Sequence, residues 1–202
     1  MKLLEDKIRE CGEVYEGGIL KVDSFLNHKI DVNLINEMGK EFARLFAGLG
    51  INKILTVEAS GIGIACIVAQ YFPGAEVLFA KKNQTKNLDN NTYCANVTSF
   101  THGREYVIRI SKNYLTENDR VLIIDDFLAA GKATFGLIEL IEQAGATLCG
   151  VGMCVEKAFQ GGGEEIRRRG INLHSLAIVD INDSKDIKFI DDAEAAEVFL
   201  GK

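Results

Sequence analysis

The chain has 202 residues, of which 47% are hydrophobic and 26% charged, and its formal net charge is −6. This length and apolar content suit a single domain with a substantial core. The acidic balance argues against a general nucleic-acid-binding protein, which would need a basic face, and no apolar run approaches the length of a membrane span.

The first half of the chain begins with residues 1–33, which show no alternation of strands and helices. A helix is predicted over 33–49, where apolar residues recur at helical spacing and glycines close the segment. A buried strand over 53–58, a helix from 60 to about 72 and a strand over 76–80 follow. Residues 81–95 are polar and rich in Asn, which indicates a mobile loop. Two further strands, 97–100 and 106–110, are joined through 101–103 in a pattern typical of a hairpin.

The second half continues the alternation with a strand over 121–125, a helix over 132–144 with Gly145 as its C-cap, and strands over 147–155 and 171–179. Strands alternating with helices predict an α/β fold, a mainly parallel sheet flanked by helices on both faces. We expect a single domain over 1–202, with a core at about 34–180. The end segments, 1–33 and 181–202, are expected to form a small hood over one end of the sheet.

The start of the chain lacks the long apolar segment of a secretory signal. Its cysteines form no Cys-x-x-Cys pair and lie mostly in apolar runs: Cys11, Cys66, Cys94, Cys149 and Cys154. We therefore interpret them as reduced core thiols of a cytoplasmic protein, and neither disulfides nor a zinc site are expected.

Two adjacent acids, Asp125 and Asp126, stand at the end of the apolar strand 121–125 and are followed by the small residues 129–131. Adjacent charges resist burial, so such a pair on an apolar strand needs a reason. Polar groups at the carboxyl end of a parallel strand face the crevice in which α/β proteins bind ligands. The backbone of the small-residue loop and the start of the next helix could bind an anion. The ordinary alternative is a solvated turn or a helix N-cap.

Two common nucleotide motifs are disfavoured. A Walker loop would need glycine where the chain has Asp126 and a hydroxyl where it has Ala133. A dinucleotide fingerprint begins at Gly61 and Gly63, but Cys66 takes the place of its third glycine. The next strand also ends in lysines rather than in the acid that binds a ribose.

A third arrangement uses three segments together. The loop 58–62, Lys81 with Lys82, and the run 125–134 each follow a predicted strand. In a parallel sheet these segments open at the same edge. Two anion cradles, two lysines and two carboxylates at one edge would suit a ligand with a monophosphate, a diol and a pyrophosphate.

This combination resembles the type I phosphoribosyltransferases, whose signature is a strand, two acids and a short phosphate loop. Segments 20–28, 58–62, 125–129 and 155–160 resemble the bacterial purine-specific members that act on xanthine, and the resemblance covers roughly residues 1–180. It implies transfer of phosphoribosyl from phosphoribosyl pyrophosphate to xanthine, giving xanthosine 5′-monophosphate and pyrophosphate. Mg²⁺ is implied as a cofactor on the pyrophosphate and ribose oxygens, with no direct protein ligand.

The resemblance also implies residue roles. Asp125 and Asp126 would be catalytic, binding the ribose hydroxyls and favouring the positive charge on the sugar. The residues implied to bind phosphoribosyl pyrophosphate are Ser60, Gly61, Lys81, Lys82, Ala129, Ala130, Gly131, Lys132, Ala133 and Thr134. Those implied to bind xanthine are Leu20, Asn27, Lys157 and Phe159, for which the ordinary alternatives are turn, strand-end or core positions.

Two positions depart from the family. Some relatives have an aspartate at the position of Ala129, as proton acceptor for the base, so no general base is named here. Relatives often have Thr or Asn at the position of Ala130, where this chain lacks a hydrogen-bonding side chain. Xanthine is partly ionised near neutral pH, and our hypothesis is that it needs less help from a base.

Two alternatives stay open at this point. The enzyme could instead use guanine, hypoxanthine or adenine, or the chain could be a non-catalytic regulator that binds a purine or nucleotide on the same fold. The expected partners are small-molecule substrates, without nucleic acid or membrane. The resemblance implies a homodimer.

Overall fold

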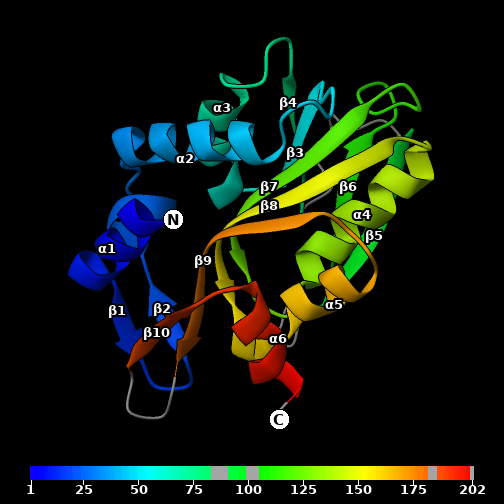
Figure 1. Cartoon of the computed structure of the whole chain (residues 1–202). Helices are drawn as coiled ribbons and strands as arrows, with labels where there is room; N and C mark the ends of the chain where they lie inside the picture. The colour runs from blue at the N-terminus through cyan, green and yellow to red at the C-terminus, as the bar shows by residue number, and fades with distance from the viewer. Residues whose placement is uncertain (83–90, 99–104, 182–185, 201–202) are drawn as a thin grey trace.

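The computed structural model describes residues 1–82, 91–98, 105–181 and 186–200. A six-stranded sheet runs through the centre of the molecule (Figure 1). Its strands, in spatial order, are β10 (Ile187–Ile190), β9 (Leu173–Ile181), β8 (Thr147–Lys157), β7 (Arg120–Leu128), β3 (Lys53–Val57) and β4 (Glu76–Ala80). All neighbouring pairs are parallel except β10 with β9. The predicted α/β class, with a mainly parallel sheet, is confirmed.

Each face of the sheet carries its own hydrophobic core, because side chains alternate along every strand. Ile54, Leu122 and Ile124 face α1 (Lys2–Cys11), α2 (Val32–Leu45) and α3 (Ser60–Ala69). Leu55 and Ile123 face the opposite way. That side is covered by α4 (Lys132–Ala144), α5 (Gly162–Arg168) and the hairpin of β5 (Thr92–Thr98) and β6 (Glu105–Ser111) (Figure 1).

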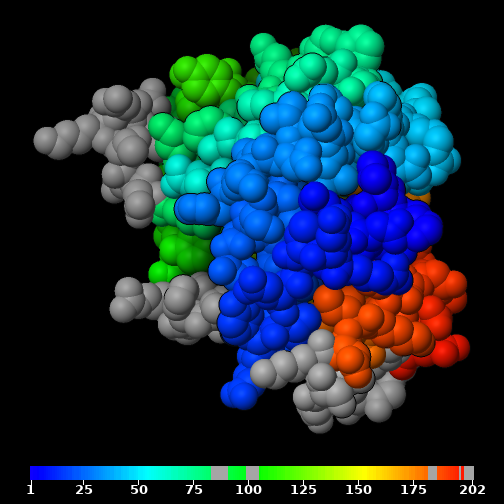
Figure 2. Space-filling model, turned by 90° about the vertical axis from the view of Figure 1, so that its left-hand side faces the viewer, coloured from blue at the N-terminus to red at the C-terminus, as the bar shows by residue number. Residues whose placement is uncertain are grey.

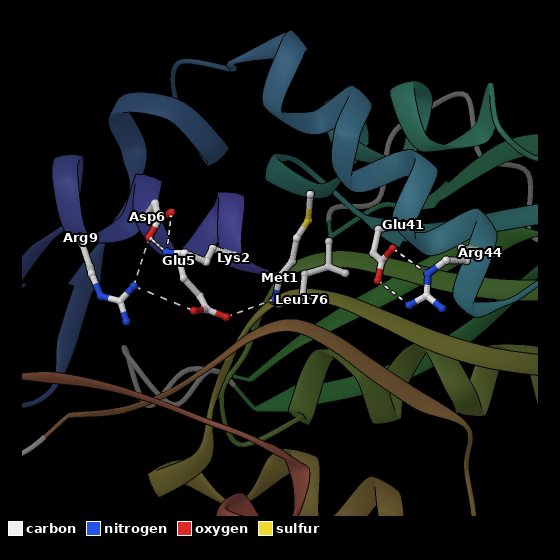
Figure 3. A network of polar contacts seen from close by, with 8 residues as sticks. All are labelled: Met1, Lys2, Glu5, Asp6, Arg9, Glu41, Arg44 and Leu176. Atoms are coloured by element: carbon white, nitrogen blue, oxygen red, sulfur yellow. Dashed lines mark hydrogen bonds and ion pairs between the residues drawn. The ribbon is translucent and has the colours of Figure 1, made fainter.

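The first thirty residues lie beside the last strands of the sheet. After α1 come the short hairpin β1 (Glu13–Tyr15) and β2 (Ile19–Lys21), and then a π-helical turn, η1 (Asp23–Asn27). Figure 2 shows the N-terminal segment next to the C-terminal strands. The Met1 nitrogen donates to the Leu176 carbonyl of β9, and the Arg9 guanidinium lies 4.3 Å from the centre of the Phe189 ring (the first contact is drawn in Figure 3).

Most predicted elements are present, with shifted ends. The helix predicted over 33–49 ends at Leu45, four residues early. The loop predicted over 81–95 was wrong at its end, since β5 begins at Thr92. Ala95 and Val97 are buried against α4, and this packing outweighs the polar character of their neighbours. The remainder of that loop, 83–90, and the predicted turn 101–103 lie outside the described residues.

The C-terminal segment adds a strand to the sheet. Here β10 pairs antiparallel with β9, and α6 (Asp192–Leu200) covers a small cluster that includes Ala158, Ile178 and Ile190. The hood formed by 1–33 together with 181–202, and the single-domain organisation, stay predictions.

All five cysteines are free in the structure, and their reduced state stays a prediction. Their expected place in the core was wrong for Cys66 and Cys94, which are exposed on α3 and on β5, whereas Cys154 is buried. In the described part of the chain, every helix is too short or too polar to span a bilayer.

Candidate active site

The point where the pairing of β3 and β7 ends sets the position of the candidate site. These two strands pair only from Lys53 to Leu55 against Val121 to Ile123, and beyond that point their ladder stops. The chain leaves β3 through α3 on one face and β7 through α4 on the other. The connections therefore diverge here, and α/β sheets bind ligands at the carboxyl ends of strands at such a point.

Asp125 and Asp126 lie just beyond the last β3–β7 pair, but inside β7 rather than after it. The prediction that the strand ends at Asp125 was wrong, because β7 continues to Leu128 through pairing with β8. Both acids are buried, at 5% and 8% exposure. Asp125 Oδ1 accepts from the Asp126 N–H at 3.0 Å, and Asp126 Oδ1 accepts from the Phe127 N–H at 2.9 Å. The local backbone thus orients both carboxylates.

Burial raises the pKa of Asp125 well above its usual value, and the neighbouring charge of Asp126 raises it further. The Asp126 N–H and the positive charge of Lys82 act in the opposite direction. Asp125 is therefore a costly charge in the ligand-free protein. Donor hydroxyl groups or a cation brought by a ligand would favour its ionised form.

The loop that starts α3 lies directly against these acids. A Cβ atom on Gly61 would come 2.7 Å from Asp125 Oδ1 and 1.9 Å from the hydroxyl oxygen of Thr56. Only glycine fits this approach without rearrangement. The Thr56 hydroxyl is fully buried and has no hydrogen-bond partner in the described part of the chain. Gly61 is thus next to Asp125, and Ser60 precedes it at the start of α3.

The small-residue loop 129–131 forms the second candidate cradle. Gly131 has φ +75°, which glycine adopts easily, and it precedes the first turn of α4. Lys132 is exposed, Ala133 is partly buried and Thr134 is buried in that first turn. Below the loop, the Gly162 N–H donates to the Ala129 carbonyl at 3.1 Å. At this point the loop is therefore held by a backbone hydrogen bond.

Lys81 and Lys82 follow β4 and reach the same edge. The Glu58 carboxylate accepts from the Lys82 N–H at 2.6 Å, which ties the segment after β4 to the loop after β3. The Lys82 ammonium lies 5.5 Å from the centre of the Tyr106 ring on β6. The Lys81 backbone pairs with Arg109. Of the two lysines, Lys82 is the more exposed.

The residues predicted to contact a base come from the N-terminal segment (Leu20 and Asn27) and from the end of β8 and just beyond it (Lys157 and Phe159). Asn27 Nδ2 donates to Asp126 Oδ2 at 2.8 Å, which joins η1 to the acid pair. The Lys157 ammonium donates to the Gly18 carbonyl at 3.3 Å, and a Cβ atom on Gly18 would come 2.9 Å from the Phe159 ring. Leu20 is only 4% exposed, so its side chain lies mainly in the core.

Sequence reasoning missed residues that complete this region. Phe127 stands beside the acid pair, and its ring centre lies 5.3 Å from the Lys157 ammonium. Burial lowers the pKa of Lys157. Gly162 supports the loop 129–131, and its place in the run Gly161-Gly162-Gly163 was a signal that went unused. No sequence pattern pointed to Tyr106, because it is far in sequence from Lys82, which it contacts.

Comparisons with known proteins identify relatives along most of the chain. A scan against models of protein families finds no match. A xanthine phosphoribosyltransferase of Ruminiclostridium cellulolyticum is 55% identical over 189 residues, which is 94% of this chain and 99% of that protein. Xanthine phosphoribosyltransferases of Clostridioides difficile (52%, covering 94% and 100%) and Bifidobacterium adolescentis (54%, covering 92% and 96%) are similarly close.

Solved structures with the same fold have lower sequence identity. The adenine phosphoribosyltransferase of Trypanosoma brucei superposes with a TM-score of 0.73 at 16% identity, covering 96% of this chain and 91% of that chain. The enzyme of Giardia lamblia gives a TM-score of 0.72 at 20% identity, covering 89% and 98%. At this identity the likeness establishes the fold alone, and it confirms the expected phosphoribosyltransferase fold.

Proposed function

This chain belongs to the xanthine phosphoribosyltransferases, and we propose that it transfers the 5-phosphoribosyl group of phosphoribosyl pyrophosphate to xanthine. The products are xanthosine 5′-monophosphate and pyrophosphate, so the enzyme is a pentosyltransferase of purine salvage. One observation supports this most directly: identity of 52–55% to such enzymes over at least 92% of the chain. The closeness of Gly61 to Asp125, just beyond the last β3–β7 pair, supports the same chemistry.

In the proposed mechanism, Asp125 and Asp126 bind the ribose hydroxyls and stabilise positive charge as the sugar approaches an oxocarbenium ion. Their orientation is already set by the backbone N–H groups of Asp126 and Phe127. Catalysis then depends on positioning and electrostatics rather than on a covalent intermediate. No carboxylate stands at position 129 to accept a proton from the base, so the ionised form of xanthine is the proposed nucleophile.

The phosphate groups are assigned to the two loops. Ala129 to Ala133 donate backbone N–H groups to the 5′-phosphate, the Thr134 hydroxyl adds a donor, and the α4 dipole favours the anion. Ser60 and Gly61 bind pyrophosphate, whose charge Lys81 or Lys82 neutralises as it leaves. The bond between Glu58 and the Lys82 backbone holds the last two segments together.

Xanthine is assigned to the region beside Phe127. The Lys157 ammonium donates to a purine carbonyl oxygen. In the ligand-free protein it donates to the Gly18 carbonyl instead. Asn27 can both donate and accept at a purine edge. Phe159 is the proposed stacking partner, and Leu20 provides apolar surface at the side.

Mg²⁺ is proposed to accompany phosphoribosyl pyrophosphate. Asp125 and Asp126 would act on this hard cation through a metal-bound water rather than as direct ligands. Its ligands would come from the pyrophosphate and ribose oxygens and from water, since Mg²⁺ keeps several waters and takes few protein ligands. When bound, the cation would supply charge neutralisation to the departing pyrophosphate.

We further propose a homodimer located in the cytoplasm and acting without nucleic acid or membrane partners. The free cysteines and the net charge of −6 are consistent with this. Sedimentation at micromolar concentrations tests the assembly, and a monomer at all concentrations would contradict it.

Competition among purines tests the activity. Xanthine, guanine, hypoxanthine and adenine are supplied together with phosphoribosyl pyrophosphate and Mg²⁺, and each nucleotide product is quantified. Xanthosine 5′-monophosphate should dominate, with one pyrophosphate released per nucleotide formed. Dominance of any other nucleotide would overturn the substrate, and binding without pyrophosphate release would overturn catalysis.

A further inference from the structure

A buried carboxylate outside the catalytic pair lies close to both proposed substrate subsites. Glu156 is 1% exposed and is the penultimate residue of β8. Its two oxygens accept from the Arg167 guanidinium at 2.7 and 2.8 Å, in the forked geometry that arginine offers. The Ser175 hydroxyl of β9 donates a third bond at 2.5 Å. The charge is therefore fully solvated by protein groups.

This ion pair holds the last turn of α5, whose first residue bonds to the phosphate loop. Arg167 belongs to α5, whose first residues lie between the carboxylate and the loop 129–131. A Cβ atom on Gly163 would come 1.8 Å from Glu156 Oε1, and one on Gly162 would come 2.3 Å from the Ala129 carbonyl oxygen. Any displacement of α5 would therefore move the surface on which the phosphate loop rests.

The same carboxylate fixes the end of β8, where the base is proposed to bind. Lys157 follows Glu156 directly, and Glu156 is paired with Leu128 of β7 and Ile178 of β9. Arg167 also contacts Asp192 at the start of α6, at 2.5 Å. One ion pair thus joins the base segment, the phosphate-loop support and the C-terminal helix.

Stability alone is a weak reason for such a pair. The free-energy cost of removing two charges from water often exceeds the gain from their attraction. Well-packed apolar residues at the same positions can give equal stability. A forked, fully bonded pair does hold its elements at one separation and angle. Transfer between two bound substrates depends on that kind of alignment.

We propose that Glu156 and Arg167 are positioning residues that hold Lys157 and the phosphate loop at the separation the transfer requires. This inference rests on the proposed function. Neither residue contacts the reacting atoms; the pair acts through Lys157 on one side and through Gly162 on the other.

The test compares this ion pair with a second buried pair far from the candidate site. Lys53 and Asp119, 3.2 Å apart and 7% and 8% exposed, lie at the amino ends of β3 and β7. The variants are Glu156→Gln and, as a matched control, Asp119→Asn. For each, Tm, kcat and the KM values for xanthine and phosphoribosyl pyrophosphate are measured well below the transition temperature.

Both variants should lose stability, whereas only Glu156→Gln should lose kcat/KM, by about 10²-fold, the cost of a misplacement near 1 Å. The loss should include higher KM values for both substrates. Equal losses of Tm with unchanged kinetics in Glu156→Gln would reduce the pair to a structural role and overturn the proposal.

Two further variants keep the test decisive should Glu156→Gln not fold. Ser175→Ala removes one donor and should raise both KM values by a smaller factor. Arg167→Lys retains charge without the fork and should be less active than wild type yet more active than Arg167→Ala; equal activity of all three would contradict the role. Wild-type turnover of xanthine is measured first, so its absence would be a failure of the proposed function and not of this inference.

Discussion

At the scale of single residues, the site combines groups that are unfavourable for folding. Asp125 places a carboxyl group where water barely reaches it, beside a second carboxyl group. The Thr56 hydroxyl is buried without a partner in the described part of the chain. Such groups cost stability unless a ligand satisfies them, and perturbed carboxyl groups in a crevice indicate function.

Asp125→Asn should stabilise the ligand-free protein at neutral pH. Because folding raises the pKa of Asp125 above 3.8, the folded state holds this proton more tightly than the unfolded chain. Its contribution to stability is complete below that value and is lost as pH rises through the raised pKa. The amide avoids the loss, so the variant should gain a few degrees in Tm at neutral pH and little in acid.

The same substitution should lower kcat by about 10²-fold, because the ribose loses a charged acceptor. Urea unfolding across pH and steady-state kinetics measure the two effects. Glu142→Gln, on the exposed face of α4, serves as a control and should change neither. A variant of Asp125 that is less stable than wild type at neutral pH would contradict the argument.

Gly162→Ala should weaken binding of phosphoribosyl pyrophosphate. The new methyl group would come 2.3 Å from the Ala129 carbonyl oxygen and 2.6 Å from the Gly131 nitrogen, both of them backbone atoms. We expect an increase of at least about tenfold in the KM for this substrate and a loss of about 1–3 kcal/mol in stability. Arg168→Ala, an exposed change on the same helix, is the control. An unchanged KM would contradict the role of Gly162 in holding the phosphate loop.

At the scale of elements, some helix and strand ends follow from the local sequence pattern and others depend on tertiary packing. The helix α4 was predicted with its exact ends, since its apolar spacing is regular and Gly145, at φ +68°, closes it. The start of β5 was predicted five residues late, at 97 rather than at Thr92. Its register depends on β6 and on α4, which covers its buried side. Short polar strands acquire their structure from such partners.

The contact between α4 and the β5–β6 hairpin leads to a prediction. A Cβ atom on Gly136 would come 2.7 Å from the Val97 side chain and 3.0 Å from that of Ile108. Gly136→Ala should therefore move the hairpin away from α4 and cost about 1–3 kcal/mol, despite the better helix propensity of alanine. Chemical denaturation measures the change, with Glu142→Ala as control. A gain in stability would contradict this, because it would mean that the hairpin moves away from α4 with no loss of free energy.

At the scale of the whole molecule, two cores share one sheet. Leu122 and Ile124 of β7 belong to one core, and Val121 and Ile123 to the other. Neither core can lose its strands without exposing the other, so the molecule should unfold as a unit. This is the physical content of the single-domain prediction.

Thermal unfolding followed by far-UV circular dichroism and by tyrosine fluorescence should give coincident transitions. The chain has five tyrosines and no tryptophan. Phosphoribosyl pyrophosphate with Mg²⁺ at about 100 times Kd should add about 2.7 kcal/mol to stability, or roughly 5–10 °C in Tm. Two separate transitions would contradict the single domain, and a Tm independent of this ligand would contradict its binding.

The chain's own pattern was enough for the α/β class, for most elements and for the edge at which the site lies. Alternating strands and helices leave little choice of architecture, and acids or glycines after parallel strands must meet at one edge. Asp125, Asp126, Ser60 and Gly131 could therefore be proposed as site residues from the sequence, and their roles stay predictions.

Tertiary structure alone decided how far the strands run and which distant groups meet. Because β7 pairs with β8, it continues past Asp125 and Asp126 to Leu128, whereas the sequence suggested an earlier end. Three contacts join residues that are far apart in the chain or on different elements. They are the hydrogen bond from Asn27 to Asp126, the hydrogen bond from Gly162 to Ala129 and the Glu156–Arg167 ion pair. Local pattern records each residue's own propensity, whereas these contacts depend on where the completed sheet places its neighbours.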